Sequence, residues 1–207
     1  YAYPLGFPKE LLKVIREHDN VCNYLDMALQ HCNTEMLKRM RRGGSKEYLT
    51  DLLAEIRESV PGIYLRTTMM TGFPGETAEM FDELCQFVAE QQFERMGVFR
   101  YSAQKGSYSD QHYVDDIPNE EKTRRALHLM KIQKNRYISL HQSLLGTIQR
   151  GMVDEYVGGK YHCRTEHSTP MADPKVIADS SHPLAIGSFC QVALTDTLGK
   201  DIAGMAV

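Results

Sequence analysis

Three short apolar runs, each followed by a longer amphipathic segment, limit the fold of this chain more than any other feature of its sequence. The runs cover residues 23–29, 63–70 and 97–102. In the segments that follow them, apolar residues recur every three or four positions, which is typical of helices with one buried face. Strands that alternate with helices at this spacing predict a parallel sheet with right-handed crossovers.

Capping residues mark where these helices begin and end. Ser45 is expected to cap the first helix, and Glu47 lies in its first turn, where a carboxylate suits the helix dipole. Pro61 and Gly62 end that helix. Asn119 is expected to cap a long third helix.

The second and third helices each carry a predicted core-facing stripe. Its members are Phe81, Leu84, Cys85 and Val88 in the second helix, and Leu127, Met130, Ile138, His141 and Leu145 in the third. A cysteine on such a stripe is usually a small core residue. The Lys and Arg residues between positions 122 and 136 are expected on solvated helix faces.

The helical period ends near residue 142. Five short strand candidates follow, separated by Gly-Gly, Pro or Asp/Ser clusters. Short strands at this spacing predict a small β-barrel or sandwich. The expected organisation is therefore α/β plus all-β, with one domain over residues 1–141 and a second over residues 142–207.

Composition excludes several classes of protein. A formal net charge of -3 gives no broad nucleic-acid footprint, and no apolar run approaches the ~18 residues of a membrane span. The five cysteines form no CxxC set, so reduced cytoplasmic thiols are expected and no metal site is evident. The chain starts without Met and without a signal peptide, which indicates a fragment.

The corner "TGFPGE" (71–76) joins the second strand to its helix and has two readings. It is either a stiff link, or a turn whose glycines let the backbone approach a ligand. Ligands of parallel sheets bind beyond the carboxyl ends of the strands, and "LQHCN" and "RYSAQKGS" are expected at that same edge.

Read together, three stretches resemble the methylthiotransferase branch of the radical S-adenosylmethionine (SAM) enzymes. They are "YLDMALQHCNTEMLKRMRRGGSKEYL", "LRTTMMTGFPGETAEMFDELCQFV" and "VFRYSAQKGS". The phrases "RRGGSKEYL" and "GFPGET" are most similar to the group that methylthiolates an aspartate of ribosomal small-subunit protein twelve. The tail resembles a TRAM domain through "LLGTIQRGMVDE" and "YHCRTEHSTP".

The resemblance implies the carboxyl-terminal half of a partial (β/α) barrel followed by a TRAM-type β-barrel. It also implies SAM as cofactor and two 4Fe-4S clusters in the full-length protein. The family's CxxxCxxC loop is missing from this chain, as are the three cysteines of the family's amino-terminal domain. The chain by itself is therefore expected to hold neither cluster and to be inactive.

The resemblance also assigns residues to the SAM pocket. They are Gln30, His31, Arg66, Thr67, Gly72, Gly75, Glu76 and Tyr101. No catalytic or metal-ligating residue is expected among the residues present.

Three of these assignments have a structural alternative. Arg66 would hold the SAM carboxylate, or else form an ion pair with an acid such as Asp26. Glu76 would hold the amino group or ribose of the ligand, or else cap the helix. Tyr101 or Phe99 would lie against adenine, with core packing favoured for Phe99. The acidic loop 107–116 is expected to face solvent.

The expected partner is ribosomal small-subunit protein twelve, in the cytoplasm, with ribosomal RNA as a further contact. From residue 141 onward there are five Lys or Arg and seven Asp or Glu residues, a net charge of -2. Because RNA binding needs clustered cations, this balance favours a basic protein as the partner of the tail. The alternatives are methylthiolation of a tRNA adenosine and a non-catalytic RNA-binding or docking module.

Overall fold

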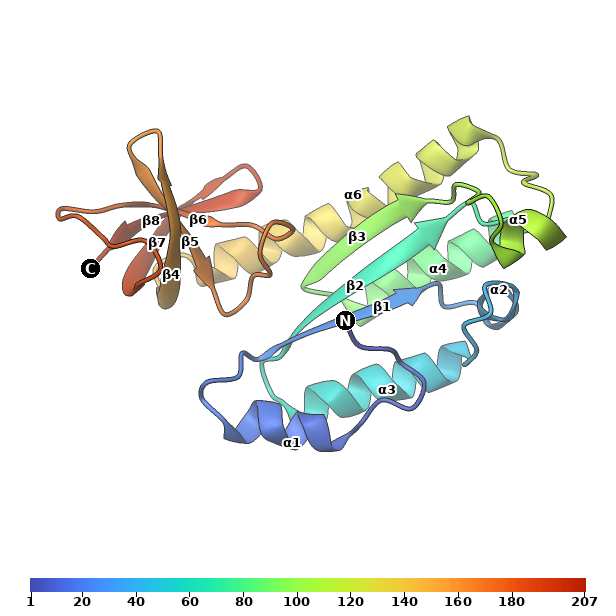
Figure 1. Ribbon diagram of the computed structural model, residues 1–207, viewed down its shortest axis with the longest axis horizontal. Coiled ribbons are helices and arrows are strands. Elements are labelled where there is room, and N and C mark those ends of the chain that lie inside the picture. The colour runs from blue at the N-terminus through green and yellow to red at the C-terminus, as the bar shows by residue number, and fades with distance from the viewer. The chain divides into compact units, whose positions relative to one another are not determined.

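The computed structural model describes residues 1–207, and they form two units (Figure 1). The first contains Tyr1–Val21 and Leu25–Arg136, and the second contains Cys22–Tyr24 and Tyr137–Val207. The division falls inside the longest helix. The predicted boundary at residues 141 and 142 stays a prediction about which parts fold independently.

The first unit is built on a three-stranded sheet in the order β1-β2-β3. Its strands are β1 (Tyr24–Gln30), β2 (Tyr64–Thr71) and β3 (Arg95–Arg100). β2 and β3 pair in parallel, with Arg66 opposite Arg95. All three arrowheads in Figure 1 point to the end of the unit where the short helices α2 and α5 lie. The predicted parallel arrangement is confirmed for these two strands.

Six helices accompany the sheet. They are α1 (Glu10–Glu17), α2 (Thr34–Arg39), α3 (Lys46–Ser59), α4 (Ala78–Gln91), α5 (Tyr108–His112) and α6 (Asn119–Leu144). The hydroxyl of Ser45 accepts the Tyr48 backbone N–H and caps α3, as its sequence predicts. Glu47 lies in the first turn, and hydrogen bonds from its own backbone N–H and from Ser45 lower the pKa of its carboxyl.

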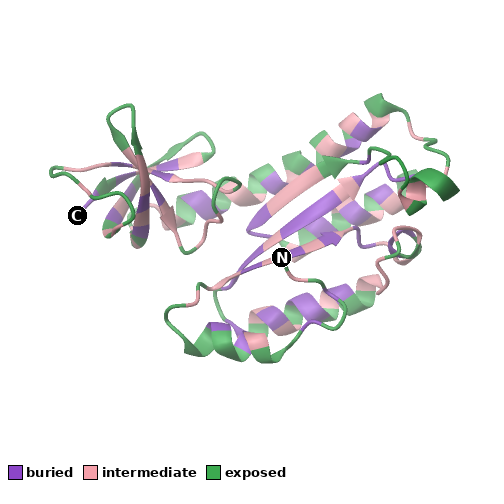
Figure 2. Ribbon diagram, viewed as in Figure 1, coloured by how far each residue is buried: buried purple, intermediate pink, exposed green.

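The two faces of the sheet differ in chemistry. One face packs its apolar side chains against residues of α1, α3, α4 and α6, forming a single core. Leu25, Met27 and Leu29 of β1 belong to this face, and they alternate with half-buried residues of the opposite face. Figure 2 shows the helices buried on one side and exposed on the other. The opposite face of the sheet carries polar residues.

The buried face of α6 matches the predicted one only in part. His141 is buried as predicted, and Leu145, just after the helix, packs against the barrel core, but Leu127, Met130 and Ile138 are exposed. The buried face also contains Lys122, Arg125, Leu129, Gln133 and Leu140. The helical period was right, but the face was wrong at the three exposed positions, because the cations and the amide on the buried face find partners elsewhere in the fold. None of the helices combines the length and apolarity needed to cross a bilayer.

The second unit is a closed barrel in the strand order β4-β5-β6-β8-β7, which confirms the predicted five-stranded module. Its strands are β4 (Ile148–Val157), β5 (Lys160–Thr165), β6 (Val176–Asp179), β7 (Phe189–Leu198) and β8 (Asp201–Ala206). β6 and β8 pair in parallel, and every other pair is antiparallel. Gly204 lets the strands close, because a Cβ there would lie 2.6 Å from the Val192 side chain.

Candidate functional site

The segments that follow the three strands meet at the carboxyl edge of the sheet. His31, just after β1, lies 3.2 Å from the Glu76 carboxylate at the start of α4. Tyr101, just after β3, packs edge-on against Phe73 with 5.0 Å between ring centroids. The structure therefore brings together the three corners that the sequence predicts to share one edge.

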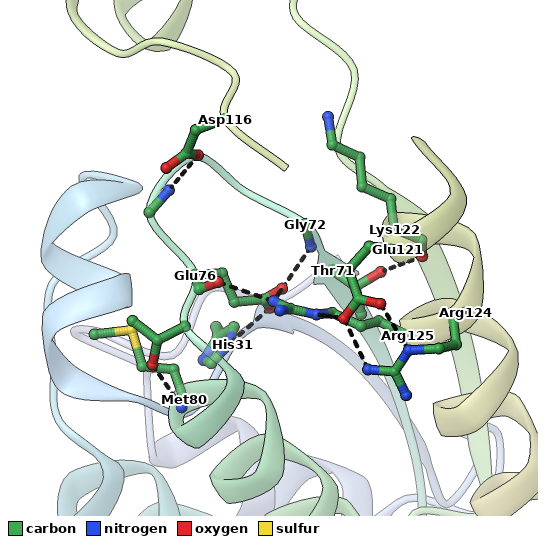
Figure 3. Close-up of polar contacts among 12 residues, drawn as sticks. His31, Thr71, Gly72, Glu76, Met80, Asp116, Glu121, Lys122, Arg124 and Arg125 are labelled. Atoms are coloured by element: carbon green, nitrogen blue, oxygen red, sulfur yellow. Dashed lines mark hydrogen bonds and ion pairs between the residues drawn. The ribbon is translucent and has the colours of Figure 1, made fainter. Parts of the chain in front are cut away.

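Glu76 is the centre of a buried polar network (Figure 3). Its Oε2 accepts hydrogen bonds from the Gly72 backbone N–H at 2.7 Å and from Arg125 at 2.6 Å. Its Oε1 lies opposite Nε2 of His31. The side chains of Glu76 and His31 are fully buried, so these donors supply the hydrogen bonds that water would otherwise give the Glu76 oxygens.

The residue that caps α4 is Thr77, which follows Glu76. The Thr77 hydroxyl accepts the Met80 backbone N–H at the start of α4. Glu76 does not cap the helix, which removes one of its two predicted alternatives. Both of its carboxylate oxygens are engaged by groups of this chain.

Arg125 of α6 is the cation of this network. Its Nη1 donates to the Glu76 carboxylate and to the Glu76 backbone carbonyl, and its Nε donates to Glu121 at 2.7 Å. Burial opposes the charge of Arg125, but the hydrogen bonds to Glu121 and Glu76 outweigh it and raise the pKa of the guanidinium. Hydrogen bonds from Arg124 and Arg125 lower the pKa of Glu121 to about 2.

Lys122 and Arg39 fill the space that the glycines of the corner leave open. A Cβ at Gly72 would lie 2.3 Å from Cγ of Lys122, and a Cβ at Gly75 would lie 2.9 Å from the Arg39 guanidinium. Both glycines have positive φ values, of 72° and 82°. The two glycines therefore do let other groups approach the backbone closely, as the second reading of this corner requires. The groups that approach are the side chains of Lys122 and Arg39.

The expectation of solvated cations is wrong for Lys122 and Arg125, which are buried, and right for Arg124, Lys131 and Lys134, which are exposed. The acidic loop 107–116 faces solvent over most of its length, as predicted, although two of its acids contact this corner. Lys122 is 2% exposed and donates to Asp115 at 2.6 Å, and the Gly75 backbone N–H donates to Asp116 at 3.0 Å. α5 also lies within the loop. Sequence reasoning missed Lys122 and Arg125, although their spacing to Leu129 was a signal that all three share one face of α6.

The polar face of the sheet carries the second group of predicted residues. Arg66 of β2 forms an ion pair with Asp26 of β1 at 2.7 Å, the structural alternative that the sequence left open. Asp26 Oδ1 and Gln30 Oε1 are buried and accept no hydrogen bond. A buried acceptor without a donor costs about 1–3 kcal/mol, so both atoms suit a ligand that donates.

The remaining predicted residues lie nearby in other roles. The hydroxyl of Thr67 donates to the Met27 carbonyl at 2.9 Å, which ties β2 to β1. Tyr101 is buried, with the Lys122 ammonium 5.1 Å from its ring centroid. Phe99 is 60% exposed and does not pack in the core, because β3 is an edge strand and Phe99 lies on the same face as Arg66, opposite the core.

Comparison with known sequences shows that the chain is similar to radical SAM proteins. Residues 3–88 match the family model of the Radical SAM superfamily. The chain is 45% identical over 204 residues to a protein of Parabacteroides distasonis, and 47% identical over 203 residues to one of Bacteroides thetaiotaomicron. Both relatives are named ribosomal protein uS12 methylthiotransferase RimO. These matches cover 99% and 98% of this chain and 47% of each relative, so the chain spans about half their length.

A solved structure shares the fold. Coproporphyrinogen III oxidase (HemN) from Escherichia coli, described as a radical SAM enzyme, matches with a TM-score of 0.54 and 16% sequence identity. The match covers 79% of this chain and 45% of that one. At this identity the likeness shows the fold alone.

Proposed function

We infer that this chain, as a member of the radical SAM methylthiotransferases, supplies part of the SAM-binding barrel of an enzyme that modifies ribosomal protein uS12. The proposed reaction replaces a hydrogen on the β-carbon of an aspartate with a methylthio group. Sequence similarity over nearly the whole chain to proteins named for this activity supports the proposal. We place the enzyme in the cytoplasm, where ribosomes are found.

The observation that carries the proposal is the polar face of the sheet. Gln30 Oε1 and Asp26 Oδ1 are buried acceptors that lack a donor, and they lie on the same face of β1. SAM carries donors that fit them, in its ammonium group and its ribose hydroxyls. We assign Gln30 and Asp26 to these donors.

Arg66 is assigned to the same ligand. Its Nη1 donates to Asp26, which holds the guanidinium beside one of the two acceptor side chains, and the planar fork of a guanidinium suits a carboxylate such as that of SAM. When bound beside a reduced 4Fe-4S cluster, SAM supplies the radical that abstracts hydrogen in this superfamily. The residues of this chain bind and orient the cofactor.

The cluster ligands are proposed to lie outside this chain. Burial raises the pKa of the Cys32 thiol to about 12, and burial raises that of Cys163 to the same value. A thiol must be deprotonated to bind iron, so both are poor ligands where they stand. The carboxylate network around Glu76 is likewise engaged within the protein and is not assigned to iron.

The barrel is proposed to be a TRAM-type module that recognises protein. Three of its cations are held in ion pairs, Arg164 by Asp154, Lys175 by Glu155 and Lys160 by Asp179. Arg150 and Lys200 are the remaining Lys and Arg residues of the barrel. Two cations are few for phosphate neutralisation, which favours a basic protein over RNA.

The activity is tested with the full-length protein after anaerobic cluster reconstitution. Purified small ribosomal subunits are incubated with the enzyme, SAM, a sulfur source and a reductant, and uS12 and tRNA are then examined by mass spectrometry. The expected result is a methylthio group on one aspartate of uS12 and none on tRNA. Modified tRNA adenosine with unmodified uS12 would overturn the assignment of substrate.

A further inference from the structure

The buried network at the carboxyl edge ends one residue away from Gln30. Gln30 itself has a φ of 70°, a left-handed conformation that costs a non-glycine residue about 1 kcal/mol or more. Such a conformation persists only when its surroundings hold it. The next residue, His31, is fixed at both ring nitrogens, so the support for Gln30 begins there.

The hydrogen bonds of His31 define its state. Its Nδ1 accepts the backbone N–H of Asn33 at 2.9 Å, so the ring proton lies on Nε2 and faces Glu76. Asn33 in turn caps α2 by accepting the Met36 backbone N–H. The orientation of His31 therefore depends on Glu76 on one side and on the start of α2 on the other.

Glu76 depends on Arg125 for its charge balance. Removing Arg125 would leave a fully buried carboxylate with the Gly72 backbone N–H and the neutral His31 as its remaining donors. A buried carboxylate without a cation is strongly disfavoured. Of the groups that contact Glu76, His31 is the side chain that can change its tautomer or orientation in response. Such a change would disturb the hydrogen bond that its Nδ1 accepts from the Asn33 backbone N–H.

We propose that Arg125 is a positioning residue for the SAM site: it fixes Glu76, Glu76 fixes His31, and His31 fixes the conformation in which Gln30 presents its side chain to the cofactor. The link to the cofactor rests on the proposed function. Arg125 lies on α6, and its hydrogen bonds go to Glu76 and Glu121, not to the residues that we assign to SAM. Its effect is transmitted through Glu76 and His31.

Arg124 provides a matched control. It is the neighbouring residue on the same helix and carries the same charge. It also donates to Glu121, at 2.6 Å. Its side chain is 62% exposed and has no hydrogen bond to Glu76. A variant at Arg124 therefore removes a guanidinium and a contact to Glu121 without disturbing the Glu76 and His31 pair.

The first measurement reads His31 directly. The ring nitrogens of His31 are observed by ¹⁵N NMR in this chain and in its Arg125→Gln, Arg125→Lys and Arg124→Gln variants. The native chain and Arg124→Gln are expected to show the neutral ring with its proton on Nε2. Arg125→Gln is expected to lose that pattern, and Arg125→Lys to keep it in part, because lysine restores the charge without the paired donors.

The second measurement is the Kd of SAM for the reconstituted full-length protein. Arg125→Gln is expected to bind SAM roughly tenfold more weakly, the equivalent of one lost hydrogen bond at Gln30, and Arg124→Gln is expected to bind as the native protein does. Native His31 signals and native SAM affinity in Arg125→Gln would overturn the proposal. So would equal losses in the two glutamine variants.

Two further outcomes are decisive. If Arg125→Gln does not fold, Arg125→Lys decides: altered His31 signals with weaker SAM binding support the proposal, and native values of both contradict it. If the native full-length protein does not bind SAM, the proposed function fails, and the His31 signals still decide whether Arg125 holds this corner.

Discussion

Single ionisable residues on the sheet show how one side chain can serve both the fold and a ligand. Arg66 and Asp26 are 13% and 14% exposed, and their ion pair crosses from β2 to β1. Removing one partner of a buried pair leaves an uncompensated charge, so loss of either residue alone is expected to destabilise the sheet. The second carboxylate oxygen of Asp26, Oδ1, accepts no hydrogen bond, so it remains able to accept one from the proposed ligand.

Substitution of Arg66 separates these two roles. Arg66→Ala in the full-length protein is expected to weaken SAM binding by roughly 2–4 kcal/mol, as for the loss of a buried charge-assisted contact. Calorimetric titration with SAM measures the loss, and thermal unfolding is followed in parallel. Unchanged SAM affinity with reduced thermal stability would show that Arg66 serves only the ion pair.

Glu121 gives the first unit a defined acid sensitivity. Its pKa falls from the ordinary 4.5 of a glutamate to about 2 because Arg124 and Arg125 donate to it. A carboxyl with a lower pKa in the folded state stabilises fully above its unfolded pKa, and this contribution is lost as the pH falls through the folded value. Glu121 therefore stabilises the protein above about pH 4.5 and ceases to do so near about pH 2.

The corresponding variant is Glu121→Gln. It is expected to unfold at lower urea concentration than the native chain above about pH 4.5, and the gap between the two is expected to close as the pH approaches about 2. A gap that stays constant across this range would refute the assignment.

Among whole elements, α6 shows most clearly what its sequence could predict. Its length and period follow from the pattern of apolar residues, and so do the caps of α3 and the five barrel strands. The buried face of α6 does not follow in full from the sequence, because apolar residues occur on more than one side of the helix. Which side packs depends on partners that are distant in sequence. Lys122 pairs with Asp115, Arg125 with Glu76, and Gln133 donates to the Phe93 carbonyl.

The same limit applies to the candidate site. The sequence indicated that the three strand ends meet, because parallel strands end at one edge. The sequence could not show that the Glu76 carboxylate is hydrogen-bonded to His31 and Arg125, because the contact with Arg125 depends on how α6 packs. Tertiary partners decide whether a polar residue in a motif is available to a ligand.

Two leucines on α6 test its orientation. Leu129 is fully buried and Leu127 is 66% exposed, two positions apart on the same helix. Leu129→Ala is expected to lower the free energy of unfolding by about 3 kcal/mol, and Leu127→Ala by less than about 0.5 kcal/mol. Urea denaturation of both variants measures the difference. Equal losses, or a larger loss at Leu127, would place the wrong face of α6 in the core.

At the scale of the whole molecule, the two units are proposed to divide cofactor binding from substrate recognition. The side chains of Glu155 and Glu166 in the barrel are 44% and 50% exposed. We assign both acids to a basic protein partner, which at Glu155 would share the carboxylate with Lys175 and His162. Tyr156 and Tyr161 are aromatic neighbours of this surface, with 4.6 Å between ring centroids. This surface lies on the barrel alone.

Charge reversal tests the assignment of the barrel. Glu155→Lys with Glu166→Lys is expected to slow association of the full-length protein with uS12, and the loss is expected to shrink as salt rises. Arg150→Ala is the control, because removing an unpaired cation should weaken RNA binding and spare protein binding. Surface plasmon resonance with uS12 and with ribosomal RNA fragments distinguishes the two. Tight, salt-dependent RNA binding without binding to uS12 would reverse the conclusion.

The most direct test of the central claim is a crystal structure of the reconstituted full-length protein with SAM. The polar face of the β1-β2-β3 sheet is predicted to hold the cofactor, with a SAM donor within hydrogen-bond distance of Gln30 Oε1 and Glu76 still engaged by His31 and Arg125. SAM bound away from this face, or Gln30 Oε1 left without a donor in the complex, would contradict the account.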